Sequence, residues 1–201
     1  MHERRRRPVS SAQPVRGAQR LWHPRVWGTV VGAAGATVFV MVNRGALPEP
    51  WPTVALCAWV VALLAYVFLV FGRPRALGEM DEVGPRSGLV YLGSVVGMLV
   101  TIRLGYVLLP DSRVEDLRPA VIVIAVGLHF LPFSAAFHTP MFMRLGVMMT
   151  ALGAAGLGLG WTWDERAAAA SAVVTGVLML VAIAGDAVDP DLAPTSAGTH
   201  P

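Results

Sequence analysis

The sequence predicts an all-α protein: a polytopic membrane bundle of six transmembrane helices with both termini in the cytoplasm. Six apolar runs of about 17 to 22 residues match the ~20 residues that a helix needs to span ~30 Å of hydrocarbon. Of the 201 residues, 55% are hydrophobic and 14% are charged, which is typical of membrane proteins. We expect a basic, disordered tail over 1–26, a membrane domain over 27–185 and a disordered tail over 186–201.

Each predicted span is bounded by polar residues or prolines. The six spans are Trp27 to Val42, Pro52 to Phe71, Gly88 to Leu109, Pro119 to Phe137, Met141 to Trp161 and Arg166 to Gly185. Proline is tolerated in the first turn of a helix, where its missing N–H would have no partner. We therefore place Pro52, Pro119 and Pro140 at or just before helix starts, and Pro110 after the third span.

Arginine distribution predicts the orientation, because basic residues accumulate in short cytoplasmic segments. Eleven arginines fall on the side of the N-terminus, at positions 4, 5, 6, 7, 16, 20, 25, 73, 75, 86 and 144. The opposite side has Arg44, Arg113, Arg118 and Arg166, together with six acidic residues. Trp51, Trp161 and Trp163 are expected at that outer interface. The chain is thus predicted to be a multi-pass protein of the cell membrane with cytoplasmic termini.

The arginines and the single cysteine indicate which binding partners and covalent links to expect. Arg4, Arg5, Arg6 and Arg7 are expected either to contact anionic lipid or only to set the topology. The absence of lysine reflects codon bias, so we do not expect nucleic-acid binding. The single cysteine, Cys57, cannot form a disulfide within one chain and is expected to be a small buried hydrophobe.

Small residues predict how the helices associate, since lipid is as apolar as leucine and close contact must drive packing. Within the predicted spans, G-x-x-x-G pairs occur at Gly28 and Gly32, Gly93 and Gly97, and Gly156 and Gly160. We expect the glycines of the fifth span to meet the small face of residues 167–172 in the sixth. In a chain so rich in glycine, chance and packing within one chain together are the favoured interpretation of these pairs, and a homo-oligomer or a partner membrane protein is the alternative.

The fourth span carries the most specific pattern, in which His129 lies near the expected membrane midplane and Pro132 interrupts the helical hydrogen bonding. A neutral imidazole could bridge helices to Ser94, Thr101 or Tyr106. An ionisable group within a membrane also suggests proton transfer or ligand binding. We expect no metal and no cofactor, because His138 lies too far along the same helix to supply a second ligand.

Arg103 and Tyr106 share one face near the outer end of the third span. A long Arg side chain near a helix C-terminus can extend to the interface and is favoured by the helix dipole. Alternatively, Arg103 points inward and contacts an anion or a lipid headgroup. The predicted spans contain no Asp or Glu to pair with it.

Gly127, His129, Phe130 and Pro132, followed by Phe137, Pro140 and Gly146, form a G-x-H-F-x-P pattern with a downstream F-x-x-P and a glycine. This segment resembles small uncharacterised bacterial integral membrane proteins of about 200 residues. The resemblance implies a polytopic membrane protein and draws attention to His129 and Pro132. It implies no reaction.

The function predicted from these residues is that of a small binding or accessory membrane protein for a lipid, a small molecule or partner helices. The alternative is a transporter or channel component with a polar path near His129 and Arg103. We do not expect an enzyme, because the spans contain neither a nucleophile with its base nor a carboxylate pair.

Overall fold

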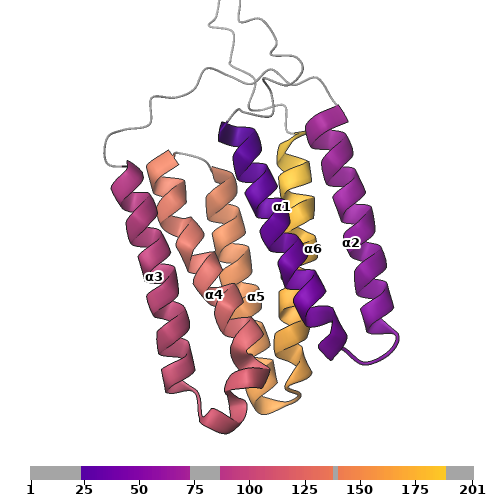
Figure 1. The fold of residues 1–201 in the computed structure, drawn as a ribbon, viewed down its shortest axis with the longest axis vertical. Coiled ribbons are helices and arrows are strands. Elements are labelled where there is room, and N and C mark those ends of the chain that lie inside the picture. The colour runs from indigo at the N-terminus through magenta and orange to yellow at the C-terminus, as the bar shows by residue number, and fades with distance from the viewer. Residues whose placement is uncertain (1–23, 73–86, 138–139, 189–201) are drawn as a thin grey trace, which may run out of the picture.

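The computed structural model describes residues 24–72, 87–137 and 140–188. All regular structure within these residues is helical (Figure 1). The six long helices are α1 (Pro24–Asn43), α2 (Trp51–Val67), α3 (Ser87–Leu108), α4 (Asp111–Phe137), α5 (Pro140–Thr162) and α6 (Arg166–Asp186). Two short segments extend them: the turn η2 (Arg44–Ala46) follows α1, and the π-helical turn η3 (Phe68–Gly72) continues α2.

Six helices in the described residues are long and apolar enough to cross a membrane, as predicted. The predicted start of the fourth helix is wrong. It begins at Asp111, about two turns before Pro119, and it continues through both Pro119 and Pro132. The early turns are polar, so water can bind the carbonyl that Pro119 leaves without an N–H partner. Asp111 in the first turn also interacts favourably with the helix dipole.

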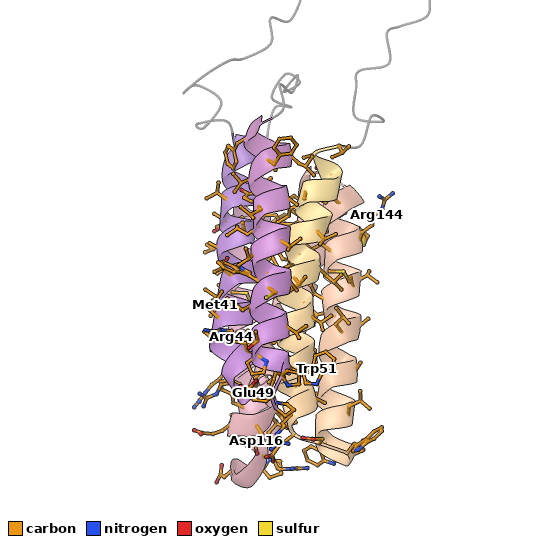
Figure 2. All side chains as sticks on the ribbon, turned by 90° about the vertical axis from the view of Figure 1, so that its right-hand side faces the viewer. Met41, Arg44, Glu49, Trp51, Asp116 and Arg144 are labelled. Carbon is orange, nitrogen blue, oxygen red and sulfur yellow. The ribbon has the colours of Figure 1, made fainter. Side chains whose placement is uncertain are left out.

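The two ends of the bundle differ in their charged side chains. The turns that join α1 to α2, α3 to α4 and α5 to α6 lie at one end, where Glu49 and Asp116 are found (Figure 2). We call this the acidic end. Arg144 lies toward the opposite end, where α1 begins and α6 finishes (Figures 1 and 2). Trp51 and Trp161 are exposed beside the acidic end, as expected for residues at a membrane interface.

Helix α6 occupies the centre of the bundle and packs against α1, α2, α4 and α5 (Figure 1). Of the residues in the apolar, membrane-spanning stretch of α6, 61% are buried, compared with 22% in the corresponding stretches of α1 and α2. The buried residues of α6 are Ala168, Ala169, Ser171, Ala172, Val173, Thr175, Gly176, Met179, Leu180, Ile183 and Ala184. Most of them are small, which lets four neighbours approach its backbone closely.

The closest contacts of α6 with its neighbours occur at glycines, where any side-chain atom would collide with the facing helix. A Cβ added at Gly176 would lie 2.5 Å from the carbonyl oxygen of Ala36 on α1. On the other side, a Cβ at Gly156 of α5 would overlap Ser171, and one at Gly160 would lie 3.5 Å from the Cβ of Ala168. The prediction that the small faces of the fifth and sixth spans meet is therefore confirmed.

Helices α4 and α5 form a second close pair. A Cβ at Gly127 would lie 2.6 Å from the backbone nitrogen of Thr150, and one at Gly146 would lie 2.8 Å from the carbonyl oxygen of Gly127. Farther toward the acidic end, a Cβ at Gly153 would lie 2.8 Å from the nitrogen of Ile124. These glycines hold α4 firmly against α5, so the residues of α4 next to Gly127 rest on a rigid support.

Helix α3 is peripheral, and α4 is its main neighbour (Figure 1). Only 6% of the residues in its apolar, membrane-spanning stretch are buried. Its G-x-x-x-G pair does not form a close helix contact, because a Cβ added at Gly93 or at Gly97 would meet no atom within 4 Å. Among the described residues this pair therefore makes no close packing contact, which leaves chance occurrence or a contact with another chain.

Two hydrogen bonds between side chains join α1 to α2. The indole nitrogen of Trp59 donates to the hydroxyl of Thr37 at 3.2 Å, and the hydroxyls of Thr29 and Tyr66 lie 3.3 Å apart. Cys57 of α2, expected to be buried, is exposed. It lines a hollow of about 630 Å³ between α2 and α6, whose other lining residues are apolar except for Thr53.

Candidate functional site

A cavity of about 350 Å³ lies between α3 and α4. This volume falls within the ~300–1,000 Å³ typical of small-molecule sites. Its lining residues are Val90, Gly93, Ser94, Gly97, Met98 and Thr101 of α3, and Ala125, Leu128, His129 and Pro132 of α4. The cavity exists because Gly93 and Gly97 leave open space where a larger side chain would fill the gap between the two helices.

His129 is the only titratable side chain among these lining residues. Its ring contacts two aromatic rings of its own helix, with centroids 4.9 Å from Phe133 and 5.7 Å from Phe130. Phe130 in turn stacks on Phe142 of α5, at 5.8 Å and nearly parallel. The imidazole thus belongs to an aromatic cluster that extends to α5.

The Nδ1 atom of His129 is buried and has no hydrogen-bond partner among the described residues. A buried polar atom without a partner costs about 1–3 kcal/mol, which makes this atom unusual in a folded protein. The predicted bridge to Ser94, Thr101 or Tyr106 is therefore not formed through Nδ1. Ser94 and Thr101 do line the same cavity as His129.

Both hydroxyls in the cavity donate to the backbone of their own helix. Ser94 Oγ donates to the carbonyl of Tyr91 at 2.7 Å, and Thr101 Oγ1 donates to the carbonyl of Gly97 at 2.8 Å. A hydroxyl has one O–H donor and two lone pairs. Each hydroxyl can therefore only accept a hydrogen bond from anything that enters the cavity.

The cavity lies off the middle of α4. His129 is ~12 Å from the end of the helix at Phe137, and the early start at Asp111 moves the helix centre away from it. Pro132, one turn later, is exposed and lines the cavity beside His129. The polar group thus lies closer to the end opposite the acidic end than predicted.

Arg103 and Tyr106 do not belong to this cavity. Neither residue lines it, and Arg103 is exposed on α3. Tyr106 instead lies beneath Arg118 of α4, whose guanidinium carbon is 5.2 Å from the ring centroid. The structure brings His129 and Pro132 together, and it places Arg103 and Tyr106 elsewhere on the α3 and α4 helices.

The part of the chain that the structure describes contains no group of three His, Cys, Asp or Glu residues that could hold a metal ion. His138, considered above as a second ligand, lies outside the described residues, as do Arg4, Arg5, Arg6 and Arg7. The role of Gly93 and Gly97 in forming the cavity was missed. The only signal in the sequence was the G-x-x-x-G pair itself, which does not show which face of α3 meets α4.

The fold is that of an all-helical bundle with six helices of membrane-spanning length, and it contains a mainly apolar cavity with three polar residues between α3 and α4. Residues 81–186, which include α3 to α6, match the model of a family of unknown function, DUF7010. The match covers more than half of the chain, so the protein belongs to this family. No curated protein and no solved structure matches it.

The matched residues include all those that line the cavity, together with the central helix α6, and they do not include α1 and α2. The expectation of a family without an assigned activity is confirmed, whereas the G-x-H-F-x-P pattern as a family feature and the bacterial origin stay predictions.

Proposed function

We propose that this protein is an integral membrane protein of the cell membrane that binds a small membrane-soluble molecule in the α3–α4 cavity. The observation that supports this function is the lining of a cavity of about 350 Å³, in which the polar residues Ser94, Thr101 and His129 lie among apolar ones. A polar group on a ligand could form hydrogen bonds with these residues, while the rest of the ligand contacts apolar side chains. The arginine distribution supports cytoplasmic termini and therefore an extracytoplasmic acidic end.

The alternative function, transport, needs a polar path between His129 and Arg103. The cavity lining includes His129 but not Arg103, and it contains no carboxylate. Binding needs only the cavity and its polar groups. The geometry therefore favours binding over transport.

The binding function can be tested by extracting the protein with its surrounding lipid in polymer-bounded nanodiscs and identifying the bound small molecules by mass spectrometry. Gly97→Leu should fill the cavity, since a side chain there starts in open space. Gly158→Leu is the matched control, because this glycine is also exposed and has no atom within 4 Å of a new Cβ, but it does not line the cavity.

We expect one small molecule to accompany the wild type and Gly158→Leu, and to be lost from Gly97→Leu. The same set of molecules in all three samples would contradict the proposal. Unchanged thermal stability of Gly97→Leu would show that the loss does not follow from unfolding.

A further inference from the structure

We propose that the α3–α4 cavity selects an uncharged, largely apolar molecule that carries a hydroxyl group or a similar hydrogen-bond donor and enters sideways from the bilayer. This inference rests on the proposed binding function and adds the chemical class of the ligand. It is derived from the donors, acceptors and charges of the lining residues, and from which of these residues are exposed.

The polar atoms of the cavity favour a donor. Ser94 and Thr101 have each used their single O–H on a backbone carbonyl, so both present only lone pairs. The sulfur of Met98 is also a weak acceptor. A molecule that can only accept hydrogen bonds, such as an ether, could not donate to the lone pairs of the two cavity hydroxyls.

The imidazole is compatible with the same class of ligand. A neutral imidazole has one N–H donor and one acceptor nitrogen. If the ring nitrogen that a ligand reaches is the acceptor, a ligand hydroxyl donates to it. If that nitrogen carries the proton, the ligand oxygen accepts from it and donates its own hydrogen to Ser94 or Thr101. A hydroxyl therefore satisfies either tautomer, whereas an ether or a ketone satisfies only one.

The absence of charge among the lining residues excludes ionic ligands. The cavity is lined by no carboxylate that would pair with a cation, and by no arginine that would pair with an anion. Transferring an isolated charge into such surroundings is far more costly than transferring a neutral polar group. An ionised fatty acid would in addition bring only acceptor oxygens to the two hydroxyls, which can themselves only accept.

The exposed lining residues indicate the route of entry. Gly93 and Gly97 on α3, and Leu128 and Pro132 on α4, are all exposed and all line the cavity. They lie well inside the two helices rather than at their ends, so the mouth opens sideways, at the level of the hydrocarbon. A ligand that reaches this mouth must already be dissolved in the bilayer.

The test uses two probes that differ by one methyl group. 4-Octylphenol has a phenolic O–H, and 4-octylanisole is its methyl ether, which keeps the ring, the chain and the acceptor oxygen. Binding of tritiated 4-octylphenol to the purified protein in detergent is measured by scintillation proximity and competed with each unlabelled compound. We expect the ether to compete at least about tenfold more weakly, since it loses the donor.

The variants assign this difference to the cavity. Ser94→Ala and Thr101→Val remove the two acceptors and should reduce the preference for the phenol, as should His129→Phe. Val and Ala add no bulk, so the first two variants keep the test valid if His129→Phe does not fold. Gly97→Leu should abolish binding of both probes, and Gly158→Leu should not.

The outcomes separate the two proposals. Equal competition by the phenol and the ether would overturn the donor requirement while leaving the binding function intact. Binding of neither probe would overturn this ligand class, and the molecules extracted in nanodiscs would then decide separately whether the cavity binds anything. Competition by ionised decanoate as strong as that by the phenol would overturn the requirement for an uncharged ligand.

Discussion

Helices α6 and α3 are nearly equal in length, with 21 and 22 residues, but they occupy opposite environments. In the apolar, membrane-spanning stretch of α6, 61% of the residues are buried, and in that of α3 only 6% are buried. The difference follows from side-chain size, because α6 presents Ala, Ser and Gly on several faces, whereas α3 presents Leu and Val around most of its surface. In a bilayer, small residues allow close packing and large ones can face lipid at little cost.

The comparison also explains where a ligand site can form. The centre of the bundle is filled by backbone contacts that leave no room, as at Gly176 and Gly127. Helix α3 meets α4 less closely, and the space left at Gly93 and Gly97 is the cavity. Its polar residues lie on the loosely packed side of the molecule, opposite the close α4–α5 contact.

The largest effect is expected from a methyl group placed in the central contact. Gly176→Ala puts a Cβ 2.5 Å from the carbonyl oxygen of Ala36 and 3.1 Å from the Cβ of Phe39, so α1 must move. We expect a loss of about 1–3 kcal/mol in the free energy of unfolding. The measurement is unfolding in mixed detergent and dodecyl sulfate micelles. Gly97→Ala on α3 is the control and should be neutral or slightly stabilising, and equal losses in both variants would contradict the comparison.

A smaller loss is expected at Gly105, where α3 approaches α4 closely. A Cβ at Gly105 would lie 2.5 Å from Cγ1 of Val121, which belongs to a side chain rather than to a backbone. A side chain can shift without moving its whole helix, so Gly105→Ala should cost about 1 kcal/mol, the low end for overpacking. The double variant Gly105→Ala with Val121→Ala should recover part of this loss. No recovery would show that the backbones, not the side chains, resist the change.

The centre of the bundle also contains a polar atom whose removal should help. Thr175 of α6 is fully buried, and its hydroxyl has no partner among the described residues. Thr175→Val keeps the shape and removes the unpartnered hydroxyl, so stability in micelles should rise by about 1 kcal/mol. Ser94→Ala on α3 is the matched change at the cavity and should alter stability less. Destabilisation by Thr175→Val would indicate a buried water that satisfies the hydroxyl.

The smallest effect is expected at the acidic end. Arg113 of α4 donates to the carbonyl of Trp161 at 3.0 Å and lies 3.9 Å from the carboxylate of Glu165. It thereby links the helix that supports α3 to the turn between α5 and α6. These groups are exposed, so Arg113→Gln should lower stability by at most ~0.5 kcal/mol, and less at high salt. Arg166→Gln at the same end is the control, and a loss well above 1 kcal/mol for Arg113→Gln alone would show that the link is not a surface contact.

Much of the fold could be predicted from the sequence because the evidence for each span is local. The number and approximate bounds of the helices followed from apolar length, and the contact of Gly156 and Gly160 with α6 followed from the short connection between the two helices. Pro119 was misleading, because a proline is also tolerated inside a helix near a wet rim. Cys57 was placed inside, although an apolar run in a bilayer protein does not distinguish a buried face from one that faces lipid.

The candidate site was predicted in part. His129 and Pro132 line the cavity, and Ser94 and Thr101, named as partners for the imidazole, lie there too. Arg103 and Tyr106 were grouped with them only because polar residues in membrane spans are rare. Sequence distance gives no information on which face of α3 meets α4, so this grouping could be resolved only by the three-dimensional arrangement.

The sequence by itself determined that six helices form and in what order they run, since each span depends on the apolar length and the flanking residues of its own segment. The tertiary structure decided that α6 lies at the centre, that α3 lies at the edge and that Gly93 and Gly97 leave a cavity beside His129. These outcomes depend on whether side chains from distant segments fit together. Such a fit is a property of pairs of helices rather than of any one segment.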